Sequence, residues 1–270
     1  MSGAAGGARR RVSIAIVTYD NEKVLGPTLE ALAAHWPTEV DARLHVVDNA
    51  SRDGSVALVE TTCARLGLPL SLRRSESGNV GFGAAHDLLI PHLDSDYHVV
   101  MNPDIMLPDG SAIPALAAFL DASPDVGMCV PRILDPAGRQ QFLCRRPLTV
   151  LDVALRFLAP GRLLRRRQEW HMMMDHDYAA TFDVPFASGC FLMVRTALFR
   201  ELGGFDPRIF LYGEDADLTR RVNAVSRTAY VPQGTVVHAW QRASYRTRNM
   251  FLIHLKSLAY YFRKWGWRLW

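Results

Sequence analysis

The chain has 270 residues, of which 49% are hydrophobic and 21% charged, so it can bury a substantial core and extended disorder is not expected. It has no apolar run near the roughly 18 residues of a membrane span, and no apolar segment behind its N-terminal arginines to form a signal peptide, so we expect a cytoplasmic protein. The net charge of +4 comes from residues 242–270, which hold seven basic residues and no acid.

Strands alternate with helices along the first half of the chain. Apolar runs predict strands over residues 11–19, 43–50, 70–75 and 97–104. Apolar residues at helical spacing predict the intervening helices, of which the first carries Leu25, Leu29, Leu32 and Trp36 and the others span residues 51–67, 79–93 and 109–123. This alternation is typical of right-handed β-α-β units, so we expect an α/β fold with a largely parallel sheet flanked by helices.

The second half of the chain is less regular. Residues 131–185 predict a long irregular region that includes three arginines at residues 165–167 beside apolar residues. This region is either a solvated basic loop with some helix or a mobile flap or membrane-facing arm, and the sequence favours neither. Residues 186–222 then predict a strand, a helix, and a loop that leads into an acidic helix start at residues 214–217, and a further strand covers residues 234–240.

Three of the predicted strands end on polar residues. Residues 18–21 read Thr-Tyr-Asp-Asn, residues 48–51 read Asp-Asn-Ala-Ser, and residues 102–104 read Asn-Pro-Asp. A single acid after a strand is more often a helix N-cap than a ligand, but the carboxyl ends of parallel strands share one edge, where such sheets bind ligands. Asp48 can accept a hydrogen bond from a ribose hydroxyl or a base N–H, and Ser51 can donate or accept, so this edge predicts a nucleoside site.

Three glycines, Gly78, Gly81 and Gly83, precede a predicted helix. They let the backbone approach a ligand where helix N–H groups favour a diphosphate, although a plain glycine turn has the same pattern. A dinucleotide fingerprint would need G-x-G-x-x-G directly after the first strand, and residues 18–26 read TYDNEKVLG instead. A nicotinamide enzyme is therefore disfavoured.

Two other classes of site are disfavoured. The cysteines are widely spaced and form no C-x-x-C pair, which predicts reduced core thiols at Cys63, Cys129, Cys144 and Cys190. No nucleic-acid module is recognisable, and acids at the predicted sheet edge would repel phosphates unless a metal intervened, so nucleic acid is not an expected partner.

Several of these segments together resemble a known family. They are VSIAIVTYDN, VVDNASRDGS, NVGFGAAHD, MNPD, GCFLMVRTALFRELGGFDPRIFLYGEDADLTRR and a later histidine. The set is similar to the inverting family-two nucleotide-sugar glycosyltransferases of the GT-A fold, in their bacterial rhamnosyltransferase-like branch. The match covers residues 12–240 and implies one Rossmann-like domain, with a nucleotide-binding half over 12–130, a variable flap over 131–185 and an acceptor and catalytic half over 186–240. Residues 1–11 are then expected to be disordered, and residues 241–270 to form a C-terminal helix.

The resemblance implies a divalent cation, Mg²⁺ or Mn²⁺, held against the donor diphosphate. Asp104 matches its carboxylate ligand, and Asn102 stands where the family often has a first aspartate. The amide of Asn102 can bind the cation only through a neutral oxygen. We therefore expect metal dependence, but Asn102 provides weaker support for it than an aspartate would. His238 matches a histidine that contacts metal or diphosphate, although a hydrogen-bonded core histidine would give the same pattern.

The resemblance also implies the catalytic and nucleotide-binding residues. Asp215 matches the base that takes the proton of the acceptor hydroxyl, with Glu214 orienting the acceptor, and these two roles could be exchanged. Matching positions imply nucleotide-sugar contacts at Thr18, Tyr19, Asp48, Ser51, Asn79, Gly81, Asn102 and Asp104. Asp20 and Asp87 replace asparagines that are usual in this branch, which leaves the details of donor recognition open there.

The resemblance favours dTDP-L-rhamnose as donor, with UDP-hexoses next, and a polyprenyl-diphosphate-linked saccharide of a bacterial surface polysaccharide as acceptor. An inactive relative that serves as a scaffold is the alternative, because Asn102 could mark a lost metal site. The sequence does not define the oligomeric state.

The C-terminal segment allows two interpretations. Its apolar residues fall on a broad stripe with basic residues beside it: Met250, Phe251, His254, Leu255, Leu258, Tyr261, Phe262 and Trp265. One interpretation is a helix packed on the domain. The other is an interfacial helix, because the chain ends in WGWRLW and basic-aromatic segments settle at anionic membranes. On the second interpretation the protein is peripheral at the inner face of the plasma membrane.

Overall fold

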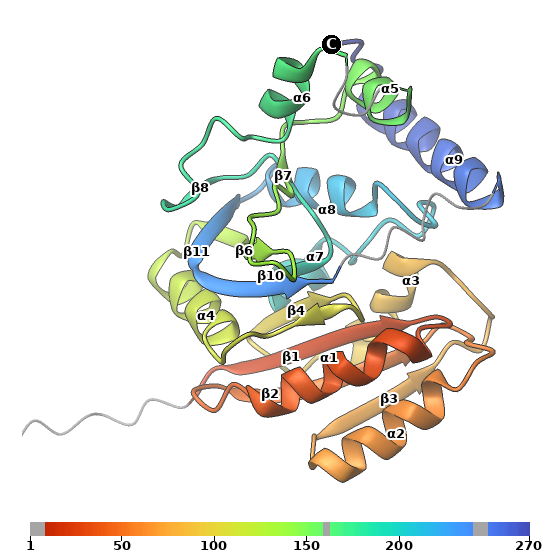
Figure 1. Ribbon diagram of the computed structural model, residues 1–270, viewed down its shortest axis with the longest axis vertical. Helices are drawn as coiled ribbons and strands as arrows, with labels where there is room; N and C mark the ends of the chain where they lie inside the picture. The colour runs from red at the N-terminus through yellow and green to blue at the C-terminus, as the bar shows by residue number, and fades with distance from the viewer. Residues whose placement is uncertain (1–8, 159–162, 240–247) are drawn as a thin grey trace, which may run out of the picture.

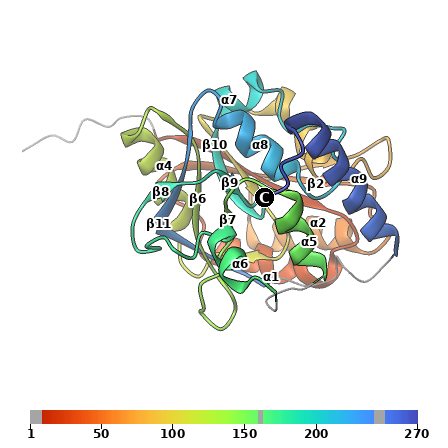
Figure 2. The same cartoon turned by 90° about the horizontal axis from the view of Figure 1, so that it is seen from above.

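The structure is a computed structural model that describes residues 9–158, 163–239 and 248–270. In this part of the chain, nine strands form one central sheet with helices on both faces (Figures 1 and 2). The strand order is β3-β2-β1-β4-β10-β6-β11-β5, and β8 pairs with β11. The strands β1, β2, β3 and β4 are mutually parallel, β6 is parallel to β11, and β10 runs antiparallel between β4 and β6. The expected α/β fold is confirmed.

The elements have the following bounds. The central strands are β1 (Arg11–Thr18), β2 (Asp41–Asp48), β3 (Leu70–Arg74), β4 (Tyr97–Met101), β5 (Ile105–Met106), β6 (Val126–Leu134), β8 (Phe182–Asp183), β10 (Phe191–Arg195) and β11 (Arg227–His238). A separate small sheet pairs β7 (Cys144–Arg145) with β9 (Phe186–Ala187). The helices are α1 (Glu22–Ala34), α2 (Ser55–Leu66), α3 (Phe82–Asp87), α4 (Ala112–Ala122), α5 (Val150–Leu158), α6 (Arg165–His171), α7 (Thr196–Glu201), α8 (Glu214–Val222) and α9 (Arg248–Trp265).

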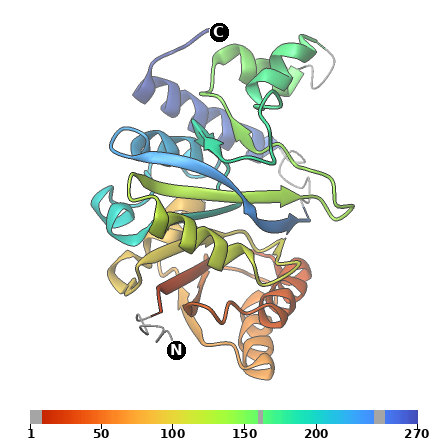
Figure 3. The same ribbon diagram turned by 90° about the vertical axis from the view of Figure 1, so that its left-hand side faces the viewer.

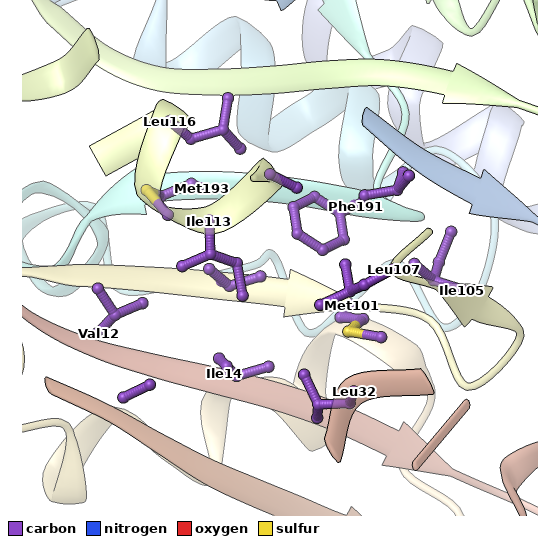
Figure 4. Packing of buried hydrophobic residues seen from close by; sticks show 14 of the residues in the cluster. Val12, Ile14, Leu32, Met101, Ile105, Leu107, Ile113, Leu116, Phe191 and Met193 are labelled. Carbon is purple, nitrogen blue, oxygen red and sulfur yellow. The ribbon is translucent and has the colours of Figure 1, made fainter. Parts of the chain in front are cut away.

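The central sheet is buried on both faces. Ile14 of β1 packs in one core layer with Leu32 of α1 and Ile113 of α4 (Figure 4). The next residue, Ala15, faces the opposite layer, where it shares a core cluster with Leu218 of α8. Because successive side chains of a strand point to opposite faces, this two-sided burial accounts for the nearly continuous apolar run of β1.

The register of the sheet brings its polar strand ends to one edge. Thr18 is paired with Asp48, and Asn102 follows β4, which is paired with β1 on the other side. Cys190 directly precedes the antiparallel β10, and its carbonyl accepts a hydrogen bond of 2.8 Å from the backbone N–H of Asn102. β11 reaches the same edge, where His238 pairs with β5.

A third layer forms at the end of the molecule opposite β1, β2 and β3. Figures 1 and 3 show α5, α6 and α9 together there. Three residues of α9, namely Leu258, Tyr261 and Phe262, share a core cluster with Phe186 and with Ala216 of α8. The expectation that part of the C-terminal segment packs on the domain is therefore confirmed.

The structure differs from the sequence-based boundaries in three places. The helix expected over residues 79–93 is limited to α3 and a 3₁₀ turn at Ile90–His92, because Gly81 has a φ of 92° and Pro91 interrupts the second part. Residues 131–185 are more regular than expected, since they contain the end of β6 and also β7, α5, α6 and β8. β11 begins at Arg227 rather than at residue 234. The expectations for residues 1–8 and 240–247 lie outside the described residues.

Two expectations from composition can be compared with the structure. All four cysteines are buried and free, which confirms the prediction of reduced core thiols. Within the described segments, no helix combines the length and the hydropathy that crossing a bilayer would require.

Candidate active site

A cavity of about 1080 Å³ opens at the polar edge of the sheet. Its lining includes Asn102 and Asp104 from the turn after β4, Glu214 and Asp215 from the start of α8, and His238 from the end of β11. Tertiary structure thus brings together the residues expected to bind metal and those expected to act on the acceptor. The other expected nucleotide contacts do not line this cavity. Thr18, Tyr19, Asp48 and Ser51 lie at or just after the ends of β1 and β2, and Asn79 and Gly81 lie just before α3, where Asn79 is bonded to Asn49.

Asp104 and His238 form a pair suited to share a cation. Oδ1 of Asp104 lies 3.3 Å from Nε2 of His238 but has no hydrogen-bond partner, and Nδ1 of His238 is also buried without one. Neighbouring ligands of an octahedral Mg²⁺ lie about 3 Å apart, given ligand distances of roughly 2.0–2.1 Å. This spacing and the orphaned carboxylate oxygen fit a metal site.

The protein alone supplies few ligands at this point. Among the described residues, no group of three or more histidine, cysteine or acidic side chains is placed to hold an ion. Mg²⁺ is usually bound by one or two carboxylates, with substrate phosphates and water completing its coordination. Asp104, His238 and the neutral oxygen of Asn102 therefore suit a cation that enters together with a diphosphate, rather than a metal site built entirely from protein ligands.

Glu214 and Asp215 have different environments although they are adjacent. Asp215 accepts hydrogen bonds from the backbone N–H groups of Gly189 (3.1 Å) and Ala216 (2.8 Å). Burial raises its pKa, and these two donors oppose that rise. Oε2 of Glu214 is buried without a partner, and burial, followed by the charge of Asp215, raises the pKa of Glu214 to about 8. Because Asp215 has two N–H donors and Oε2 of Glu214 has none, burial favours the protonated form more strongly at Glu214 than at Asp215.

Asp217, the third acid of α8, has a structural role. Its side chain is completely buried and accepts hydrogen bonds from Nε of Arg221 (2.8 Å) and from Nε1 of Trp265 (2.7 Å). Its Oδ1 also lies 2.6 Å from Nζ of Lys264, which contacts Asp206 at 2.8 Å as well. Lys264 and Trp265 therefore attach α9 to the turn of α8 that carries the candidate catalytic pair.

The polar residues at the ends of β1 and β2 are held largely by one another. The side chain of Asn49 donates to Oδ1 of Asn79 (2.9 Å) and to the carbonyl of Gly81 (3.2 Å), and accepts from the N–H of Val80 (3.0 Å). Ser51 donates its N–H to Asp48 at 3.0 Å. We call residues 18–21, 48–51 and 78–81 the rim. Its loops are fixed relative to each other before any ligand binds.

Two of the glycines singled out in the sequence allow close packing within the protein. A Cβ at Gly81 would lie 2.2 Å from the carbonyl oxygen of Phe210, and one at Gly83 would lie 2.6 Å from Phe205. The N–H of Phe82 donates to the same Phe210 carbonyl at 3.1 Å. These glycines therefore allow close packing against Phe205 and the loop before α8. This packing explains why the positions are glycine, so the glycines alone do not indicate a ligand site.

Two arginines that line the cavity, Arg145 and Arg156, were not predicted from the sequence as site residues. Arg145 of β7, Arg156 of α5 and His254 of α9 contribute to its wall, and Tyr212 stacks on His254 with ring centroids 4.3 Å apart. Tyr212 also has a φ of 69°, which is unusual for an aromatic residue. The fragments GRQQFLCRRP and LDVALRF carry no motif, so only their position in the fold reveals Arg145 and Arg156.

Comparison with known proteins identifies the family. Residues 13–203 match the family model described as "Glycosyl transferase family 2". The chain belongs to this family. The resemblance found in the sequence is thereby confirmed, and the protein is a family-2 glycosyltransferase.

Two curated relatives narrow the assignment further. The chain is 30% identical over 247 residues to a Mycobacterium tuberculosis protein named N-acetylglucosaminyl-diphospho-decaprenol L-rhamnosyltransferase, covering 83% of this chain and 75% of the relative. It is 25% identical to rhamnosyltransferase WbbL of Escherichia coli over 259 residues, covering 91% and 90% of the two chains. These similarities assign the chain to the rhamnosyltransferase branch of family 2.

Solved structures support the fold of this family-2 glycosyltransferase. A mannosyltransferase from Pyrobaculum calidifontis in complex with GDP-Man and Mn²⁺ aligns with a TM-score of 0.66 at 19% identity, over 95% of this chain and 64% of that one. Glucosyl-3-phosphoglycerate synthase from Mycobacterium tuberculosis aligns with a TM-score of 0.59 at 13% identity, over 96% and 81%. Both confirm the GT-A fold.

Proposed function

We propose that the protein is an inverting glycosyltransferase that moves L-rhamnose from dTDP-L-rhamnose to a lipid-linked saccharide, a precursor of a bacterial surface polysaccharide. The observation that carries this proposal is the meeting of Asp104, His238 and Asp215 in one cavity beside the rim. The names of the two curated relatives support L-rhamnose as the sugar, and one of them supports a diphosphate-linked lipid acceptor.

Asp215 is proposed as the base. Inversion by direct displacement requires a carboxylate that takes the proton of the acceptor hydroxyl while its oxygen attacks the anomeric carbon. The two backbone donors leave each oxygen of Asp215 one further lone pair, and they fix the carboxylate as it faces the cavity. Protonated Glu214 can donate a hydrogen bond to the acceptor and thereby orient it.

Asn102, Asp104 and His238 are proposed to hold the donor diphosphate and its cation. A bound Mg²⁺ or Mn²⁺ would neutralise charge that develops on the leaving diphosphate. In the chain itself, Oδ1 of Asp104 and Nε2 of His238 lie 3.3 Å apart, and both residues line the cavity. Thr18, Tyr19, Asp48, Ser51, Asn79 and Gly81 are proposed to contact the nucleoside along the rim, where Oγ1 of Thr18 is buried without a partner.

The test is a transfer assay with a panel of nucleotide sugars, in the presence of Mn²⁺ and after chelation with EDTA. The proposal expects transfer from dTDP-L-rhamnose with an inverted product, and loss of the rate after chelation. Preference for a UDP-hexose would show that the donor is a UDP-hexose and not dTDP-L-rhamnose. Absence of transfer from every donor, together with no thermal shift on adding donors, would favour the scaffold alternative.

We also propose that the end of the molecule formed by α5, α6 and α9 rests on an anionic membrane surface. Several large apolar side chains are exposed there: Leu163, Leu164, Trp170, Phe251, Leu252, Leu255, Trp267, Leu269 and Trp270. Since Lys264 and Trp265 hold the helix in place, the informative variant is Trp267→Ala with Trp270→Ala. It should bind less to phosphatidylglycerol vesicles in a sedimentation assay, and unchanged sedimentation would contradict the proposal.

A further inference from the structure

The wall of the cavity formed by β7 and α5 carries two arginines. Arg145 and Arg156 both line the cavity, together with Asp215 of α8. α5 lies at the end of the molecule away from the rim (Figures 1 and 3). These cations are therefore placed on the opposite side of the cavity from the proposed nucleoside contacts.

The charges of the two arginines act on the candidate base. Both guanidinium groups lower the pKa of Asp215, against the larger effect of burial, and Arg156 also lowers the pKa of His254. Two acids line the same wall, but each has its own arginine partner. Asp152 is bound by Arg167 at 2.8 Å, and Glu169 is bound by Arg165 at 2.7 Å. The wall is positively charged overall.

Apolar surface adjoins this positive wall. Leu148, Val153, Met174 and Leu258 line the cavity beside the arginines. The helices α6 and α9 also carry exposed apolar side chains, which include Trp170 and Phe251. A ligand suited to both features has an anionic head and a hydrocarbon tail, with a polar group that reaches Asp215.

We infer that Arg145 and Arg156 bind the diphosphate of a prenyl-linked saccharide acceptor, with its sugar towards Asp215 and its hydrocarbon leaving across α6 and α9. This inference rests on the proposed function, because it assigns the residues that bind the acceptor of that reaction. Guanidinium groups donate paired hydrogen bonds to phosphate oxygens, which a diphosphate offers in number. The cavity then holds two separate diphosphates, the donor's at Asp104 and the acceptor's at the arginine wall.

The test is a binding measurement that does not need catalysis. The probe is N-acetylglucosaminyl-diphospho-farnesol, and its affinity is measured by isothermal titration calorimetry. The variant with both Arg145→Gln and Arg156→Gln should bind the probe at least about 100-fold more weakly, since each of the two lost charge-assisted contacts should weaken binding at least about tenfold. Arg166→Gln removes an exposed arginine of α6 that does not line the cavity, and its affinity should stay within about twofold of the unmodified protein.

Further measurements distinguish a diphosphate site from a loss of folding, a change in donor binding, or binding of the hydrocarbon alone. The double variant should keep its melting temperature and its affinity for dTDP-L-rhamnose with Mn²⁺, and Arg145→Lys should lose less affinity for the probe than Arg145→Gln. The corresponding farnesyl glycoside without the diphosphate should bind equally to the double variant and the unmodified protein. Phosphatidylglycerol micelles should not displace the probe.

Four results would overturn the inference. These are equal binding of the probe by the double variant and the unmodified protein, equal losses for the glycoside and the probe, displacement of the probe by dTDP alone, or displacement by phosphatidylglycerol. If no nucleotide sugar supports transfer while binding of the probe still depends on the arginines, the proposed function fails and the anion site stands.

Discussion

The rim and the cavity differ in how their polar groups are satisfied. In the rim, Asn49 bonds to Asn79, Val80 and Gly81, so the loops hold one another in place. In the cavity, Asp104, Glu214 and His238 each keep a buried polar atom without a partner. Buried polar groups are normally hydrogen-bonded, because leaving one unpaired costs about 1–3 kcal/mol.

Because of this difference, the rim and the cavity suit different parts of a ligand. A prearranged rim can receive a nucleoside with little loss of conformational entropy, whereas the orphaned atoms of the cavity are places where a ligand or cation would add interactions. Thr18 is the exception in the rim, since its Oγ1 is buried and unpartnered. If the two regions have separate roles, substitutions should disturb rim and cavity independently.

Asp215→Asn should have the largest effect. Loss of the base should reduce kcat by about 10³-fold, within the range for general base catalysis, while the Kd for the donor changes little because the rim is intact. Steady-state kinetics and donor titration measure the two quantities. Glu214→Gln serves as the matched control and should reduce kcat less. A greater loss of kcat in Glu214→Gln than in Asp215→Asn would assign the role of base to Glu214.

Asp217→Asn should disturb the support of the cavity. It removes the buried charge between Arg221 and Lys264 and should lower the free energy of unfolding by about 3 kcal/mol, measured by urea denaturation. The kcat should fall too, because α8 loses its attachment to α9. Asp183→Asn removes an exposed carboxylate paired with Arg227 and should cost about 0.5 kcal/mol. Equal costs in the two variants would contradict a structural role for Asp217.

Asn49→Ala should affect the rim and spare the cavity. Loss of its three hydrogen bonds should lower the free energy of unfolding by about 2 kcal/mol and weaken donor binding. Thermal denaturation and donor titration check both effects. Asn223→Ala, which removes one bond to the carbonyl of Val184, should cost about 1 kcal/mol and leave donor binding unchanged. Unchanged donor affinity in Asn49→Ala would contradict a role of the rim in nucleotide recognition.

Glu214 should make the stability of the protein depend on pH. Its pKa is raised to about 8 in the folded protein, so its protonated form stabilises the fold below about pH 4.5, and this contribution is lost as the pH rises towards 8. Urea denaturation between pH 5 and 8 should show a flatter profile for Glu214→Gln. The profile of Glu60→Gln, an exposed residue of α2, should match that of the unmodified protein.

The sequence predicted most of the first half of the fold, because its signals are local. The strands at residues 11–19 and 43–50 lie within one or two residues of β1 and β2, since a buried run with turn residues after it needs no distant information. The pairing of β6 with β11 was not predicted, because it joins segments about a hundred residues apart in sequence. The sequence predicted a helix that starts too early at α3, because the close packing of Gly81 against Phe210 is a tertiary contact.

By itself, the sequence determined the α/β class, the polar strand ends and the family, since these depend on residue types at fixed spacing. Only the tertiary structure revealed the structural role of Asp217, because α9 brings Lys264 and Trp265 to its buried carboxylate. It also placed Arg145 and Arg156 beside Asp215. A charge acquires its role from the groups that burial and folding place around it, and those neighbours come from distant parts of the chain.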